Sequence, residues 1–339
     1  MIKRKGWKFW LPLLLLPLPF MVLSLFVGRY SVSGGEVLSA LLHFCGFSSD
    51  AGVSRNSFAV VIHLRLPRII AGAFVGAGLS VSGAAFQGVF HNPLISPGLL
   101  GVTAGAGFGA ALAILFVPVP WGSYVMAFLF GSVAVLMSYW VARIYRTVPT
   151  VMLVLGGTVV TAIFNALISL LKYIADPEKQ LPAIVYWLMG DISGVEYSDF
   201  WALIPIMIGV GILLASGWRI NVLSMGDKEA QAMGVPARKC KNVVILAATM
   251  ATAGAVCLAG NIGWVGLVIP HISRMLAGND NRRLLPVSMM VGAAFMVIVD
   301  TVSRTMAQAE IPLGILTSLI GAPFFIYLLK KTKGGGWRV

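Results

Sequence analysis

Long apolar segments separated by short polar ones extend along nearly the whole chain. A membrane-spanning helix needs about 20 mostly apolar residues, and ten segments meet or approach this length. The pattern therefore predicts an all-α polytopic membrane protein with ten transmembrane helices. Their approximate ranges are 9–27, 67–87, 97–117, 121–142, 151–173, 199–217, 242–260, 262–277, 284–304 and 312–330.

The segment from Ala259 to Leu285 interrupts this pattern. It places a Gly-rich apolar stretch directly before a Pro-His pair and a basic turn. In lipid every backbone N–H and C=O needs a partner, so a broken span persists only beside other protein or an aqueous cavity. The segment therefore predicts part of a transport pathway. The residues of this broken-span motif are Gly263, Gly266, Pro270, His271 and Arg274.

Composition and charge agree with a membrane location. Of the 339 residues 58% are hydrophobic and 11% charged, and the mean hydropathy of +0.89 is far above that of ordinary soluble proteins. A net charge of +13 would suggest a nucleic-acid partner in a soluble protein. Most Lys and Arg residues, however, fall on one side if both termini are cytoplasmic, as the positive-inside rule requires, so we expect no nucleic acid. We interpret residues 9–27 as a retained span, because no small-residue cleavage site follows them.

Two extramembrane loops carry distinctive sequences, although neither is long enough to fold as a separate domain. The outer loop 174–198 contains an apolar stretch, 181–191, which predicts a short helix that either lies in the interface or closes an outer mouth. In the inner loop 218–241, Gly226 and Gly234 bracket the sequence KEAQAM. Over Met225 to Lys241 we predict two short helices around a glycine turn. They form either an element that fits a groove on a partner and passes movement into the membrane, or an ordinary amphipathic loop.

The chain also contains two segments with weak internal similarity. Residues 71–101 and 251–278 both run from a small-residue-rich helix through a Pro-containing break into a second helix. The first copy starts outside and the second inside, which predicts inverted repeats, a device by which the two halves of a transporter enclose a central path.

Three arginines, Arg65, Arg68 and Arg304, lie at predicted outer ends of spans, the unfavoured side for basic residues. They either form a basic surface that pairs with carboxylates of an extracytoplasmic protein, or pair with local acids such as Glu310 and snorkel to headgroups. Asp300 is the one carboxylate well inside a predicted span. A structural role, paired within the bundle with Arg304 at i,i+4, is favoured for it over ion transport.

Two predicted inner turns, His91 to Leu94 and Thr147 to Val151, lie near the inner end of the expected path. Proline in such turns is usually a helix stop. Small polar and apolar side chains there could alternatively close a gate without fixing a charge in the pore. The candidate gate residues are Asn92, Leu94, Thr150 and Val151.

Several motifs are missing from the sequence. It contains no G-x-x-x-x-G-K-[ST] phosphate loop, nucleophile elbow or zinc signature, and its histidines and cysteines show no ligand spacing. We therefore expect no catalytic residue, metal or cofactor in this chain. Active transport would draw on an ion gradient or on a separate ATPase.

With these residues in view, the chain resembles the FecCD-type permease subunits of ABC importers for iron-siderophore complexes, haem and vitamin B12. The resemblance covers about 64–329. The segments that carry it are LRLPR (64–68), SGAAFQGVFHNPLISPGLLGVTAGAG (82–107), MGDKEAQAMGV (225–235), GNIGWVGLVIPHISRM (260–275), NRRLLP (281–286) and IPLGILTSLIGAPFFIYLL (311–329).

The resemblance implies a single permease domain over 1–339 with the ten-helix, vitamin B12 permease-like fold of a type II importer. It implies that the inner loop seats in a cleft of the ATP-binding subunit, that the three outer arginines pair with glutamates of a substrate-binding protein, and that the four gate residues line the inner gates. The implied ATPase-coupling positions are Gly226, Asp227, Glu229, Ala232 and Gly234.

The implied assembly is a dimer, most simply of two copies, with two ATP-binding subunits that hold ATP and Mg²⁺ and one binding protein, in the cytoplasmic membrane of a prokaryote. The implied cargo is a metal chelate: iron-siderophore, haem or cobalamin. Relatives also handle molybdate. Two other functions are weaker: a gradient-driven secondary transporter needs more pore carboxylates than Asp300, and a membrane enzyme needs a His, Asp or Glu cluster.

Overall fold

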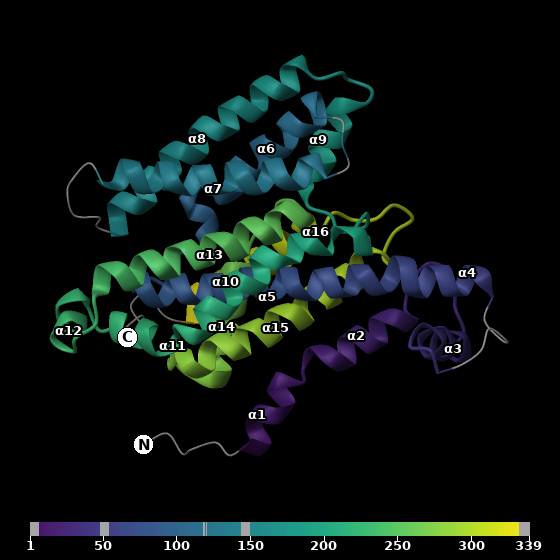
Figure 1. Cartoon of the computed structure of the whole chain (residues 1–339), viewed down its shortest axis with the longest axis horizontal. Coiled ribbons are helices and arrows are strands. Elements are labelled where there is room, and N and C mark those ends of the chain that lie inside the picture. The colour runs from purple at the N-terminus through teal and green to yellow at the C-terminus, as the bar shows by residue number, and fades with distance from the viewer. Residues whose placement is uncertain (1–6, 48–53, 118, 120, 144–149, 332–339) are drawn as a thin grey trace.

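A computed structural model describes residues 7–47, 54–117, 119, 121–143 and 150–331. Within these ranges the secondary structure is entirely helical (Figure 1). In chain order the elements are α1 (Trp7–Leu14), α2 (Pro17–Phe26), α3 (Gly34–Phe44), α4 (Arg55–Phe58), the π-helix η1 (Ala59–Arg65), α5 (Leu66–Phe90), the 3-10 helix η2 (Pro97–Leu100), α6 (Val102–Phe116), α7 (Gly122–Arg143), α8 (Thr150–Ile174), α9 (Gln180–Met189), the 3-10 helix η3 (Tyr197–Leu203), α10 (Ile204–Ala215), α11 (Gly217–Leu223), α12 (Asp227–Ala232), α13 (Ala237–Ala259), α14 (Val265–Ala277), α15 (Asn281–Ser303) and α16 (Leu313–Lys331).

The all-α membrane fold predicted from the sequence is confirmed, but the count of ten spans is not. In the described part of the chain six helical segments are long and apolar enough to cross a bilayer, and the other apolar helices are shorter. The six are Arg55–Phe90, Gly122–Ala142, Met152–Ile174, Tyr197–Ala215, Ala237–Ala259 and Asn281–Ser303.

Proline and glycine shorten several of the predicted spans. The predicted span 9–27 divides into α1 and α2 because Pro17 has no N–H to continue α1 and suits the first turn of a new helix. The span predicted at 97–117 begins as η2, and Gly101, with a φ of +82°, separates η2 from α6.

Helix α5 lies at the centre of the molecule. In its most apolar window 83% of the residues are buried, against 33% in α7 and in α8. Small residues allow this: a Cβ on Gly76 would overlap the Gly292 carbonyl of α15, and a Cβ on Gly83 would overlap the Gly266 carbonyl of α14. Helix backbones therefore approach closely, as small residues permit in membrane proteins.

Two groups of helices meet along α13. Helices α5, α10, α13, α14 and α15 pack together, whereas α6, α7 and α8 form a second layer on the other side of α13 (Figure 1). The segments proposed as repeats are both helix–break–helix units, α5 to α6 and α13 to α14, and α5 contacts both α13 and α14. Their inverted relation remains a prediction.

Candidate translocation and coupling sites

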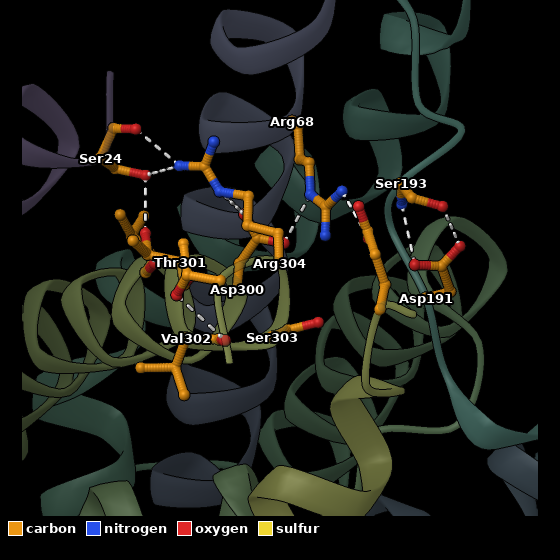
Figure 2. Close-up of polar contacts among 12 residues, drawn as sticks. Ser24, Arg68, Asp191, Ser193, Asp300, Thr301, Val302, Ser303 and Arg304 are labelled. Carbon is orange, nitrogen blue, oxygen red and sulfur yellow. Dashed lines mark hydrogen bonds and ion pairs between the residues drawn. The ribbon is translucent and has the colours of Figure 1, made fainter. Parts of the chain in front are cut away.

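Following the predicted topology, we call the end of the bundle that carries α11 and α12 the inner end, and the end that carries α3 and α4 the outer end (Figure 1). At the outer end, five charged residues form what we call the outer ionic cluster: Arg65, Arg68, Asp300, Arg304 and Glu310. Arg68 joins both acids, since its Nε lies 2.6 Å from Asp300 Oδ1 and its Nη1 lies 2.8 Å from Glu310 Oε2. The Nε of Arg304 lies 3.7 Å from Asp300 Oδ2 (Figure 2).

The other donors of the cluster bind the last turn of α2 and the residues that follow it. Arg304 Nη2 donates to the carbonyl oxygen of Ser24 at 2.6 Å and to its hydroxyl at 2.5 Å (Figure 2). Arg65 donates to the carbonyl oxygens of Leu25 and Tyr30, each at 2.5 Å. Charge-assisted hydrogen bonds of this kind are the stronger ones in proteins, so the cluster fastens the first helices to the bundle.

The three outer arginines are buried among the helices. Only 4% of Arg65, 6% of Arg68 and 6% of Arg304 is exposed. The pairing of Asp300 with Arg304 and that of an arginine with Glu310 are therefore confirmed, with Arg68 as the nearer partner of Asp300. A pocket of about 230 Å³ opens beside the cluster and is lined by Arg29 as well as by the three arginines. Docking of a binding protein onto these arginines stays a prediction.

At the inner end, α12 presents the predicted coupling residues. Gly226, with a φ of +125°, precedes the helix, and Gly234, with a φ of +76°, follows it. Ala230 is fully buried and fixes the helix to the bundle, and the Val235 N–H donates to its carbonyl oxygen at 2.9 Å. The side chains of Asp227, Glu229 and Ala232 are exposed. These three predicted coupling residues are thus accessible at the inner end.

The predicted second short helix of the inner loop is wrong. Residues after the glycine turn belong to the first turns of α13, which begins at Ala237 directly after Pro236 and continues to Ala259. The sequence ARKCKN contains no glycine or proline that could end a helix before the apolar span. A salt bridge of 2.6 Å from Lys241 to Asp227 joins this helix to α12. Since Asp227 is half exposed, the pair contributes about 0–1 kcal/mol.

The inner turn after α5 is ordered by its own side chains. His91 adopts a left-handed conformation, with a φ of +51°, and its Nε2 lies 2.9 Å from the carbonyl oxygen of Leu223 in α11. Asn92 Oδ1 accepts a hydrogen bond from the Leu94 N–H at 2.9 Å, and 43% of Leu94 is exposed. These contacts hold the predicted gate residues Asn92 and Leu94 beside α11.

The second predicted gate turn is only partly described. Thr150 and Val151 are the first residues of α8, and 144–149 and the side chains of these two residues lie outside the described part of the chain. The structure therefore does not test whether the two turns meet, and the four gate residues remain a prediction.

The break lies where the predicted spans 242–260 and 262–277 meet, and Pro270 is not part of it. Helix α13 ends at Ala259, and positive φ angles at Gly260 and Trp264, +65° and +69°, separate it from α14. Pro270 instead lies inside α14, where it has no N–H for the carbonyl of Gly266 four residues earlier. That carbonyl faces Gly83 of α5. The proline is accommodated by close helix packing and does not end the helix.

A carbonyl at the end of α13 finds its partner in a neighbouring segment, since the Asp191 N–H donates to the Ala259 carbonyl oxygen at 2.9 Å. The adjoining Gly190 carbonyl oxygen accepts from the Leu313 N–H at the start of α16, also at 2.9 Å. A cavity of about 430 Å³ borders the break, lined by Leu188, Met189, Asn261, Gly263, Gly314, Ile315, Ser318 and Leu319. The break thus satisfies both conditions for irregular backbone at membrane depth, protein partners and a cavity. Toward the inner end, Arg274 Nη2 donates to Gln87 Oε1 of α5 at 3.2 Å.

One inner contact was not anticipated from the sequence. Asn221 of α11 donates from Nδ2 to Asp280 Oδ1 at 2.6 Å, and its Oδ1 accepts from the N–H and the Nδ2 of Asn281, at 2.7 and 2.8 Å. Asp280 caps α15, since it accepts from the Arg282 N–H at 3.0 Å. A polar residue before a helical segment signals such a cap, but nothing in the sequence indicates its partner on α11.

Asp280 gives the stability of the inner end a pH dependence. Partial burial raises the pKa of this carboxyl, but hydrogen bonds from Arg282 and Asn221 outweigh burial, so its pKa lies below the ordinary value of 3.8. Its contribution to stability is therefore present above about pH 4 and is lost as the pH falls through the lowered pKa. Melting temperatures should fall more for the wild type than for Asp280→Asn between about pH 5 and pH 3. Equal falls would contradict this assignment.

The whole chain can be compared with known proteins. A family model described as the FecCD transport family matches residues 13–331. This chain belongs to the FecCD transport family. Among curated relatives, the permease is 41% identical to the molybdate import system permease protein MolB of Haemophilus influenzae, over 93% of each chain. It is 40% identical to the cobalamin import system permease protein BtuC of Halobacterium salinarum, over 89% of this chain and 82% of the relative.

Solved structures agree with this membership. The FecCD permease superposes on a metal-chelate type ABC transporter in an inward-facing conformation with a TM-score of 0.84 and 40% identity, over 96% of this chain and 99% of the other. PsaBC from Streptococcus pneumoniae shares the fold with a TM-score of 0.58 at 16% identity, over 80% of this chain and 92% of the other. The protein is therefore a multi-pass ABC transporter permease, a class whose members are generally not enzymes.

Proposed function

We propose that this permease is the membrane subunit of an ABC importer that moves a metal chelate, an iron-siderophore, haem or cobalamin, into the cytoplasm of a prokaryote. The observation that carries the proposal is α12, a short helix with exposed Asp227, Glu229 and Ala232 that buried Ala230 fixes to the bundle. Such a rigid, projecting helix suits a groove on a partner that supplies mechanical work. That partner is an ATP-binding subunit, one for each of two permease copies.

The second copy is proposed from the broken span. The cavity of about 430 Å³ beside the break is bordered by the strongly exposed Leu319 of α16. An exposed apolar side chain beside this cavity would be covered if a second copy enclosed the path between the two chains. In this arrangement a binding protein delivers cargo at the outer ionic cluster, and both termini are cytoplasmic.

A molybdate-type oxyanion is the second candidate cargo, because the permease is 41% identical to MolB. A gradient-driven carrier is less suited to the structure. Asp300, the acid such a carrier would need, is 1% exposed and lies 2.6 Å from Arg68 and 3.7 Å from Arg304, so two arginines already occupy the place of an entering cation.

ATPase measurements on the assembled complex in lipid test the proposed function. In the variant Gly226→Pro with Glu229→Arg, proline cannot adopt the φ of +125° at position 226, and arginine reverses a charge on the exposed face. We expect the binding protein to stimulate hydrolysis in the wild type, and the variant to lose this stimulation by at least about tenfold while the complex still assembles. Uptake that follows an imposed proton or sodium gradient, with no ATPase bound, would contradict the proposal.

A further inference from the structure

Helices α5 and α15 connect the two ends of the permease. At the outer end, Arg68 of α5 and Asp300 of α15 form the 2.6 Å ion pair at the centre of the outer ionic cluster (Figure 2). Both helices then run side by side through the bundle toward the end that carries α11 and α12 (Figure 1). The pair therefore connects the predicted binding-protein face with the predicted ATPase face.

Close packing makes these two helices move together. A Cβ built on Gly76 of α5 would lie 2.6 Å from Met296 Cγ and would overlap the carbonyl of Gly292. A Cβ on Gly292 would in turn overlap the hydroxyl of Ser80. Backbones in such close contact cannot slide past each other without separating, because packed interiors resist small displacements. A shift at the outer end therefore displaces the inner end of both helices.

At the inner end both helices hold α11. From the end of α5, His91 Nε2 bonds to the carbonyl oxygen of Leu223 at 2.9 Å, and because a carbonyl only accepts, Nε2 must carry the proton. From the start of α15, Asn281 gives two hydrogen bonds to Asn221 Oδ1. Leu223 is the last residue of α11, three positions before Gly226 at the start of α12.

The backbone of His91 supports a positioning role. Its left-handed φ of +51° is uncommon for a residue other than glycine, and the conformation aims the ring away from α5 toward α11. The same turn carries the predicted gate residues Asn92 and Leu94, so α11, the gate turn and α5 meet at this one side chain.

We propose that the α5–α15 pair passes the state of the outer ionic cluster to α12 through α11, and that His91 and Asn221 are the positioning residues of this inner joint. The inference rests on the proposed function, since it needs a binding protein outside and an ATPase inside. ATP bound to the ATPase at the inner face then changes the affinity of the outer face for the binding protein. Thermodynamic linkage makes this effect reciprocal.

The test uses the full complex in nanodiscs. The dissociation constant of the purified, substrate-free binding protein is measured with and without a non-hydrolysable ATP analogue, and the ratio of the two values reports the coupling. We compare the wild type with His91→Asn plus Asn221→Ala. Asparagine tolerates the left-handed conformation but is too short to reach Leu223. Ser224→Ala is the matched control, because the hydroxyl of Ser224, the residue after α11, makes only a local hydrogen bond in the described structure, to the Asn221 carbonyl oxygen.

We expect a ratio of at least about fivefold in the wild type and in Ser224→Ala, and a ratio within about twofold of unity in the double variant. His91→Gln, which retains an amide donor of similar length, should restore most of the coupling lost in His91→Asn. If the double variant does not assemble, each single variant should lower the ratio. An unchanged ratio in assembled variants overturns the inference, whereas a wild type that binds neither partner overturns the proposed function as well.

Discussion

Replacing Asp300 with alanine is expected to lower the free energy of unfolding by about 3–5 kcal/mol, the usual cost of removing one partner from a buried ion pair. Asp300 is 1% exposed and lies 2.6 Å from Arg68 and 3.7 Å from Arg304. Without it, Arg304 has no acid within 4.0 Å among the described residues and Arg68 keeps only Glu310. Thermal melting followed by size-exclusion chromatography in detergent measures the loss.

Two variants calibrate the effect of Asp300→Ala. Glu178→Ala removes an acid from an exposed turn before α9 and should change stability by no more than about 0.5 kcal/mol. Glu310→Gln, at a side chain 24% exposed, should have an intermediate effect. Wild-type melting of Asp300→Ala would mean that the arginines reach water without it, and the outer ionic cluster would then not stabilise the fold.

Adding a single methyl group at Gly83 should be nearly as damaging. The new Cβ of Gly83→Ala would overlap the backbone carbonyl of Gly266, a group that cannot turn aside as a side-chain end can. Helices α5 and α14 would have to separate along their contact, so we expect a loss of about 3 kcal/mol, at the upper end of overpacking costs. The yield of folded monodisperse protein and its melting temperature measure the loss.

Gly211→Ala is the matched control for Gly83→Ala. Gly211 also lies within a helix, α10, but a Cβ there meets nothing within 4 Å. Because alanine is the better helix former, this variant should be neutral or more stable by up to about 1 kcal/mol. Equal behaviour of the two variants would show that α5 and α14 do not approach as closely as described.

The helices were predictable because the apolar segments are long and glycine and proline mark their ends. α7, α8 and α13 follow the predicted ranges within a few residues. The ion pairing of Asp300 and Arg304 was also predictable, since residues four apart share a helix face. The nearer partner, Arg68, is 232 positions away in the chain, and only the packing of α5 on α15 brings it there.

The break itself lies between the predicted spans 242–260 and 262–277, but the place of Pro270 was harder to predict. Proline is the strongest helix breaker in a sequence, yet Pro270 lies within α14 because Gly83 leaves room for the carbonyl that the proline cannot bond. The true break falls at Gly260 to Trp264, and Trp264 has a positive φ that its residue type would not suggest. Likewise, Asn221 and His91 gain their partners only from tertiary structure.

The central position of α5 also determines which helices meet the bilayer. Helices α7 and α8 and the segment Tyr197–Ala215, which contains α10, are 33% buried over their apolar windows, whereas α5 and α13 are 83% and 78% buried. A change in acyl-chain length therefore acts first on these three outer segments, through the tilt that corrects hydrophobic mismatch. Membrane thickness therefore affects α5 only through its contacts with neighbouring helices. The innermost helix is shielded from direct contact with lipid.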